Sequence, residues 1–531
     1  MAGSFSSTVA STWAYYTAAG ITSFLLVYIT YQILLHPLNR YPGPLLAKLT
    51  DGYNGFYASK RELHLRTWQN QLKYGSVIRQ GPNKLIFSSI NALQDIYKSD
   101  RTTKPRAYIA LGPGLSTPTT ITAIDRQVHR SRRQLVGQVV SERFMRMFEP
   151  TMVEQVDLFI QKIFLSAQKA TRTPINITER ARYLGLDLAG LLGFGYNLSL
   201  QDSDENRFIL PMLDAGAYWS GIFLHWPNSR RFRIGLVAVK IFRQLRPKYL
   251  SLMEKMITSR AKQDKDARND LYSIVADSLE SKSGGIRQSE LWAEANLFLP
   301  AAGDTTKTAL CAVFFYLSRN PSCYEKLASE IRSTFNSGNE IRGPTLAGCT
   351  YLRACIDEAL RMSPPASGIL WREPFPENQA FAVDGHVIPK GTIIGVNIYS
   401  VHHNEEYFPD PFTFQPERWL SETITPEKKK IMRDAFIPFS LGPRGCAGKA
   451  MAYLEVSLVM AKTLWYFDFK PASGSVGKVG SGASNMGYGR ERSEEFQLFD
   501  IFTASHDGPY LIFQCREGFC RDLDGSQLDP Y

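Results

Sequence analysis

The segment FSLGPRGCAG, residues 439–448, places one cysteine among three glycines, a proline and an arginine. Gly445 and Gly448 are expected to let the backbone approach a bound group and to adopt turns that other residues avoid. The free amides of a helix predicted to begin near Gly448 favour a thiolate at Cys446. A thiolate in a tight loop serves as a nucleophile, a redox partner or a metal ligand. The alternative is a buried cysteine that has only a structural role.

The surroundings of Cys446 argue against two of these uses. No histidine lies nearby in sequence to act as a base for a nucleophile, and no second cysteine is close enough for a redox pair. The chain has no C-x-x-C pair, so a structural zinc site has little support. A single thiolate can instead be the sole protein ligand of haem iron. Arg444 then suits a haem propionate, and Phe439 packs near the sulfur.

The pattern Phe439-x-x-Gly442-x-Arg444-x-Cys446-x-Gly448 resembles the haem-binding loop of the cytochrome P450 superfamily, the haem-thiolate monooxygenases. The resemblance implies heme b with Cys446 as the axial iron ligand. Two further family motifs occur in the expected order, Glu358-Ala-Leu-Arg361 and Pro416-Glu417-Arg418-Trp419. By resemblance, Glu358, Arg361 and Arg418 form a buried ion triad that locks an irregular segment beneath the haem. The resemblance extends from Tyr41 to about Arg516.

The same resemblance implies further contacts to the haem propionates. His129-x-x-x-Arg133 occupies the place of the family's W-x-x-x-R pair, with histidine in place of tryptophan. Arg372, after the Ser-Pro-Pro that follows Arg361, is similar to another propionate ligand. The alternative for each arginine is a solvated surface charge.

The segment LFLPAAGDTTKTAL, residues 297–310, resembles the family's central helix, which carries an acid–alcohol pair. Asp304 and Thr305 supply that pair and are expected to relay protons to bound oxygen. Ala302 stands where the family has glycine, and Gly303 follows one place later. Pro300 removes one helical hydrogen bond, so we expect Pro300 and Gly303 to form a kink. The alternative for Thr305 is a helix-interior threonine bonded back to a carbonyl.

The resemblance implies a monooxygenase that inserts one atom of O2 into an apolar substrate. Electrons come from NADPH through a reductase, with cytochrome b5 as a second partner. The sequence of several stretches is similar to that of fungal family members that act in secondary-metabolite biosynthesis. The alternatives are a haem-thiolate isomerase or dehydratase, which needs no external electrons, and a non-catalytic haem protein. The Asp304–Thr305 pair argues against both.

The elements that must position these residues are mostly helical. Most of residues 140–320 has amphipathic helical periodicity, and residues 380–400 alternate like a small sheet with a turn at Asp384-Gly385. The predicted fold class is mainly α with a minor β-sheet (α+β), the cytochrome P450 fold. One large domain is predicted over residues 49–516, before a polar tail at 517–531.

An apolar, uncharged run at residues 18–35 predicts a transmembrane anchor. Residues 1–17 would then be luminal and residues 36–48 a proline-rich hinge. A signal peptide and a buried core helix are the alternatives. Arg40 and Lys48 follow the run and nothing basic precedes it, which predicts a single-pass endoplasmic reticulum protein with a cytosolic catalytic domain.

The formal charge of +11, from 61 basic and 50 acidic residues, favours anionic lipid or an acidic protein partner. Ordinary solubility is the alternative. A cluster at Arg126, Arg130, Arg132 and Arg133 fits an acidic reductase, whereas no nucleic-acid-binding signature occurs. The first of the seven cysteines is Cys311, which favours a reducing compartment over a disulfide framework.

Overall fold

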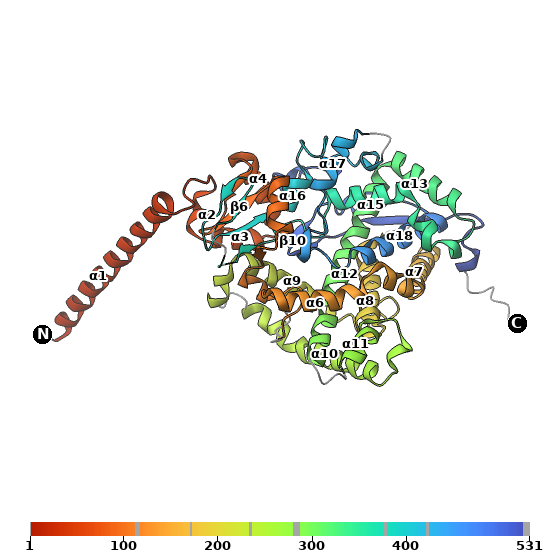
Figure 1. Ribbon diagram of the computed structural model, residues 1–531, viewed down its shortest axis with the longest axis horizontal. Helices are drawn as coiled ribbons and strands as arrows, with labels where there is room; N and C mark the ends of the chain where they lie inside the picture. The colour runs from red at the N-terminus through yellow and green to blue at the C-terminus, as the bar shows by residue number, and fades with distance from the viewer. Residues whose placement is uncertain are drawn as a thin grey trace.

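The computed structural model describes residues 2–111, 117–169, 173–232, 236–279, 287–375, 377, 380–420 and 424–523. A long N-terminal helix projects away from a body in which helices dominate and the sheets are small (Figure 1). The expected mainly α class with a minor β component is therefore confirmed. Residues 524–531 of the predicted tail lie outside the described residues.

The helices of the described chain fall into a short N-terminal set, a long central set and a C-terminal set. The N-terminal set is α1 (Ala2–Thr30), α2 (Leu45–Leu49), α3 (Gly52–Ser59), α4 (Leu63–Tyr74) and α5 (Ile90–Leu93). The central set is α6 (Arg126–Val139), α7 (Glu142–Lys169), α8 (Ile177–Phe194), α9 (Ile209–His225), α10 (Leu236–Ala261), α11 (Leu271–Leu279) and α12 (Gln288–Arg319). The C-terminal set is α13 (Pro321–Thr334), α14 (Gly343–Ala347), α15 (Thr350–Met362), α16 (Ile398–His402), α17 (Pro426–Ala435) and α18 (Lys449–Tyr466).

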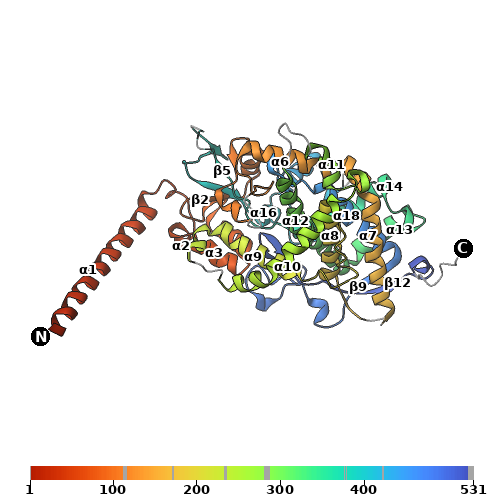
Figure 2. The same ribbon diagram turned by 90° about the horizontal axis from the view of Figure 1, so that it is seen from below.

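Helix α12 runs through the middle of the body, beside α8 and α18 (Figure 2). It buries residues on most of its faces, including Leu310, Phe314 and Phe315, because it is surrounded by other elements. It continues as one helix through Pro300, and the kink expected at Pro300 and Gly303 stays a prediction. This central helix forms part of the largest buried apolar cluster of the described chain.

Strands are short and form small separate sheets. Strand β1 (Val77–Arg79) pairs antiparallel with β2 (Lys84–Phe87), and β2 pairs parallel with β8 (Ile393–Val396). The predicted turn at Asp384-Gly385 joins β6 (Ala382–Val383) to β7 (His386–Val387), and both turn residues have positive φ. The remaining pairs are β3 (Thr102–Thr103) with β5 (Glu373–Pro374), β10 (Phe499–Ile501) with β11 (Thr503–Ser505), and β12 (Tyr510–Cys515) with β4 (Ile175–Asn176) and β9 (Phe467–Pro471).

The N-terminal helix is longer than the predicted segment 18–35. It begins at Ala2 and passes into a π-helical turn at Tyr31–Leu35, and Thr12–Leu35 is apolar enough and long enough to cross a membrane. The predicted hinge at residues 36–48 is docked on the body. Tyr41 is buried, the Arg79 N–H donates to the Pro42 carbonyl at 2.7 Å, and α2 begins within the segment.

Candidate active site

A cavity of about 330 Å³ lies between α12 and the loop that precedes α18. Its walls are mainly apolar, and they bring together most of the residues singled out in the sequence. The predicted residues that line it are His129, Arg133, Ala302, Thr305, Arg372, Phe439, Arg444, Cys446 and Gly448. Asp304 is not among the lining residues, although it is next to Thr305 in the chain.

The loop at residues 439–448 folds back on itself and presents Cys446 to the cavity. The Cys446 N–H donates to the Phe439 carbonyl at 2.8 Å, and the Gly445 N–H donates to the Gly442 carbonyl at 3.0 Å. The glycine that the backbone requires is Gly442, which has φ +67° and would place a Cβ 2.0 Å from the Tyr97 carbonyl oxygen. Gly445 and Gly448 have φ of −64° and −79°, so the expected special turns at these two glycines are wrong.

Cys446 lines the cavity and its surface is accessible there, although many protein atoms surround the sulfur. Burial raises the pKa of the Cys446 thiol, and this outweighs the opposing effects of the Gly448 N–H, Arg133 and Lys449. The Gly448 N–H therefore acts in the expected direction but does not by itself offset burial. A thiolate here needs a further positive charge, such as a bound metal ion.

Five basic side chains gather on one wall of the cavity: Lys104, His129, Arg133, Arg372 and Arg444. Among the described residues, none of the five forms an ion pair with a carboxylate. Burial, followed by Arg444, Lys104, Arg133 and Arg372, lowers the pKa of His129 to about 3. Burial, followed by Arg372, also lowers the pKa of Arg444 to about 10. This wall therefore holds uncompensated positive charge and fits an anionic ligand.

Backbone contacts fix the orientation of these cations. Arg444 donates to the carbonyls of Ala123 and Ile124, the latter at 3.0 Å. Arg133 donates to the Gly445 carbonyl at 2.7 Å and so connects α6 to the cysteine loop. Buried Arg372 donates to its neighbour's carbonyl and lies over the Tyr97 ring.

The cytochrome P450 family model matches residues 42–479. The chain belongs to the cytochrome P450 family. P450 relatives of similar length include cytochrome P450 monooxygenase apf7 of Gibberella fujikuroi, which is 32% identical over 97% of this chain and 99% of its own. AKT7 of Alternaria alternata is 30% identical over 94% and 96% of the two chains. Monooxygenase poxM of Penicillium oxalicum is 34% identical over 92% and 93%. The chain is accordingly a P450 monooxygenase, an oxidoreductase enzyme.

The P450 family implies haem iron bound by a thiolate, and the cavity residues fit this group. One cysteine lies in the wall, the opposite wall is a largely apolar helix, and the basic wall matches two propionates in charge. The hydroxyl of buried Tyr108, another lining residue, has no hydrogen-bond partner among the described residues. Such an atom is costly in an apolar wall unless a ligand reaches it.

Glu358, Arg361 and Arg418 meet beneath the cavity, fully or almost fully buried. Two bonds of 2.8 and 3.0 Å join Glu358 to Arg361, and Arg418 Nε lies 2.9 Å from Glu358 Oε1. Arg361 also donates to the carbonyls of His402 and Pro411, each at 2.8 Å. The arrangement connects α15 to the irregular segment after α16. The single carboxylate pairs with both arginines, and backbone carbonyls accept hydrogen bonds from further N–H groups of both.

Thr305 and Asp304 point to different sides of α12. The Thr305 hydroxyl borders the cavity and also donates to the Ala301 carbonyl at 2.6 Å. Thr305 therefore faces the cavity, as a proton relay requires, and is bonded back to its own helix, as the alternative expects. Buried Asp304 lies 3.3 Å from both Arg182 Nε and Lys307 Nζ. Arg182 also forms an ion pair with Asp214 on α9. The Asp214 side chain is about half exposed.

Gly303 has a packing role. A Cβ there would lie 2.6 Å from a methyl group of Leu186, and a Cβ on Gly185 would lie 3.2 Å from the Gly303 Cα. The two glycines let α8 and α12 approach closely. Ala302 occupies the cavity side instead.

Sequence reasoning missed Lys104 and Glu294 among the cavity residues. Lys104 carries no local motif, and long-range folding alone brings it to the basic wall. Glu294 lies on the predicted central helix, and an acidic residue on an otherwise apolar helix face was the available signal.

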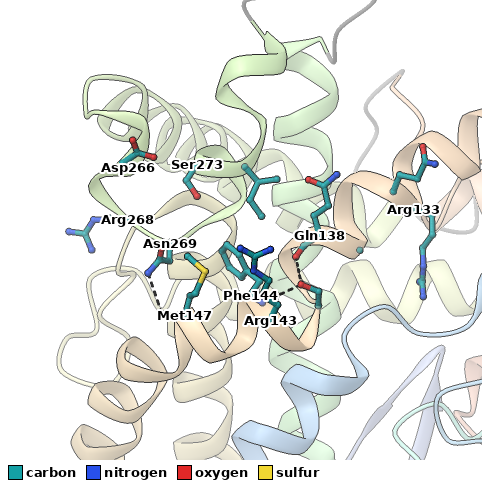
Figure 3. A pocket seen from close by; sticks show the side chains of 13 residues that line it. Arg133, Gln138, Arg143, Phe144, Met147, Asp266, Arg268, Asn269 and Ser273 are labelled. Carbon is teal, nitrogen blue, oxygen red and sulfur yellow. Dashed lines mark hydrogen bonds between the residues drawn. The ribbon is translucent and has the colours of Figure 1, made fainter. Parts of the chain in front are cut away.

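A larger, open groove of about 880 Å³ lies outside this cavity, at the corner between α6 and α7 (Figure 3). Arg143 and Arg268 are exposed in it, and Arg133 borders both spaces. The four arginines of the predicted basic cluster on α6 do not all lie on the surface. Arg126 and Arg130 are exposed, whereas buried Arg132 pairs with Glu290.

Proposed function

We propose that the protein uses heme b to insert one oxygen atom from O2 into an apolar organic substrate, with electrons from NADPH. The observation that carries this proposal is that Cys446, Thr305 and five basic side chains line the same cavity. When bound, a haem with a thiolate ligand supplies the capacity to cleave the O–O bond. The chain's own residues bind the group, exclude water and supply protons.

In this proposal Cys446 is the axial iron ligand. Arg444, Arg372, Arg133 and His129 bind the propionates, and Lys104 and Tyr108 add a cation and a donor to the same wall. Phe439, whose ring lies 5.2 Å from that of Tyr453, shields the sulfur side. Gly448 leaves room beside the sulfur at the start of α18. The triad of Glu358, Arg361 and Arg418 maintains the fold under the loop.

Thr305 holds a proton beside the reacting atoms, because its hydroxyl borders the cavity. Asp304 acts from behind α12 and exchanges protons with solvent near Arg182 and Asp214. The relay therefore includes water between Asp304 and Thr305, since the two side chains face different sides. General acid–base steps of this kind contribute roughly 10²–10⁴-fold to a rate.

The proposed partners follow from surface charge and the N-terminal helix. A reductase with an acidic face, or cytochrome b5, docks over the exposed arginines of α6 and the neighbouring groove, close to the Cys446 loop. Helix α1 anchors the protein in the endoplasmic reticulum membrane, and Arg40 and Lys48 keep the catalytic domain cytosolic. A role in fungal secondary-metabolite biosynthesis is proposed from the organisms of the relatives and their similarity over almost the whole chain.

The test compares wild type with Cys446→Ser and Cys355→Ser, the second being a buried cysteine outside the cavity. Reduced wild type treated with carbon monoxide should show the red-shifted Soret band of thiolate ligation. Only Cys446→Ser should lose it. Wild type with reductase should then consume NADPH in step with product formation. A thiolate spectrum with product formed in the absence of NADPH would favour an isomerase or dehydratase.

A further inference from the structure

Two buried polar atoms without hydrogen-bond partners among the described residues lie in the cavity wall, at Glu294 and Thr120. Glu294 is 0% exposed, and its Oε1 accepts a 2.6 Å hydrogen bond from the Thr120 N–H. Its Oε2 and the Thr120 hydroxyl form no hydrogen bond of regular geometry, although the hydroxyl lies close enough to help lower the pKa of Glu294. Both residues line the cavity. The carboxyl group is therefore tethered by one oxygen while the other remains available to a ligand.

The position of Glu294 on α12 places this pair far from the proposed reacting centre. Glu294, Phe298, Ala301, Ala302 and Thr305 recur at helical spacing and all line the cavity, so they occupy one face of the helix. Eleven residues separate Glu294 from Thr305, a rise of about 16 Å along the axis. The cavity-lining residues between them, Leu297, Phe298, Ala301 and Ala302, are apolar. A ligand that reaches both ends needs a polar group remote from the oxidised carbon.

The chemistry of that polar group follows from the surrounding charges. An unpartnered buried carboxyl is costly, and a donor that reaches it recovers the lost hydrogen bond. Burial raises the pKa of Glu294 to about 7, and the nearest charges acting on it belong to Arg132 and Lys104. These two cations disfavour a positively charged ligand. A neutral donor such as an amide N–H remains.

We propose that Glu294 and Thr120 form a substrate-anchoring subsite for a neutral secondary amide. The amide N–H donates to Glu294 Oε2, and the Thr120 N–H holds the other carboxyl oxygen. The inference rests on the proposed function, since it takes the cavity as the substrate site. It narrows the substrate class to lipophilic molecules that carry an amide at the end remote from the position oxidised.

The probes are N-methyldecanamide and methyl decanoate, which differ at the anchoring group by N–H against oxygen. Both are titrated by isothermal calorimetry into full-length, haem-loaded protein. The variants are Glu294→Gln and, as the control, Glu325→Gln at an exposed site on α13. Glutamine retains an acceptor for the Thr120 N–H but presents NH2 in place of Oε2. If Glu294 serves only to hold Thr120, Glu294→Gln therefore leaves the ratio of amide to ester affinity unchanged. Because each protein is judged by its ratio of amide to ester affinity, errors from detergent partitioning and from loss of protein cancel.

Wild type and Glu325→Gln should bind the amide about tenfold more tightly than the ester, as expected for a hydrogen bond to a charged group. In Glu294→Gln the ratio should fall to one or below, because a donor then faces the amide N–H. An equal ratio in all three proteins, or no measurable amide binding to wild type, overturns the proposal. Carbon monoxide spectra of the same samples separate this result from the haem assignment, because calorimetry does not depend on iron ligation.

Discussion

Arg133 Nη1 donates a 2.7 Å hydrogen bond to the carbonyl of Gly445, the residue before Cys446. The contact joins α6 to the cysteine loop, and Nη2 lies 3.4 Å from the Cys446 carbonyl. One side chain therefore supports the backbone of the proposed ligand and borders the basic wall. Loss of Arg133 should affect haem retention as well as local structure.

Arg133→Ala should lower the ratio of haem to purified protein and speed haem loss to an acceptor protein. A hydrogen bond from a charged donor is worth about 1.5–3 kcal/mol, which corresponds to at least about tenfold in affinity. Pyridine haemochrome measurements give the ratio. Arg130→Ala is the control, since Arg130 is exposed on the same helix. Equal haem content in the two variants would remove Arg133 from the binding site.

Gly442→Ala should destabilise the cysteine loop for two reasons. The left-handed backbone costs about 1–2 kcal/mol for a residue with a Cβ. In addition, that Cβ would meet the Tyr97 carbonyl oxygen at 2.0 Å. Gly474→Ala isolates the first effect, because Gly474 has φ +70° with open space around it. Thermal unfolding should show a clearly larger loss for Gly442→Ala, and similar losses would contradict the clash.

Thr305→Ala should uncouple NADPH consumption from product formation, because it removes the hydroxyl that borders the cavity. Product formed per NADPH should fall by about tenfold or more, within the range of general acid–base effects, while hydrogen peroxide rises. Thr305→Ser retains a hydroxyl and should restore most of the coupling. Unchanged product per NADPH in Thr305→Ala would remove Thr305 from the proton relay.

Glu455 on α18 should make stability fall as pH rises. It is 0% exposed, both carboxyl oxygens lack partners among the described residues, and burial raises its pKa to about 8. Between the unfolded pKa of about 4.5 and this value the native state binds the extra proton, so raising the pH favours unfolding.

Glu455→Gln removes that dependence. Its stability relative to wild type should grow by up to about 1.4 kcal/mol per pH unit between pH 5 and 8. Urea unfolding at several pH values measures the difference. Glu325→Gln, at an exposed site on α13, should follow wild type. A pH-independent difference for Glu455→Gln would show that the carboxyl does not titrate in this range.

The parts of the site that the sequence predicts are those with short, rigid spacing. Glu358 and Arg361 are three residues apart on one helix and so share a face, and the Cys446 loop is a continuous segment. Helix content and the Asp384-Gly385 turn follow from periodicity and turn chemistry. These features depend little on the rest of the chain.

The parts that could not be predicted depend on contacts between distant segments. Asp304 turns away from the cavity because Arg182 and Lys307 attract it. Gly303 packs against Leu186 on α8, a partner that its own segment does not reveal. The pKa of Cys446 likewise follows from burial by the assembled protein rather than from its loop.

The contact between Gly185 and Gly303 limits how this enzyme can be redesigned. With no side chain between them, α8 already restrains the back of α12, and a methyl group on either glycine would push the two helices apart. Room for bulkier compounds must therefore come from trimming residues such as Phe298 on the opposite face. Directed evolution of new selectivity should accordingly accumulate its changes on that inner surface and leave the glycine pair untouched.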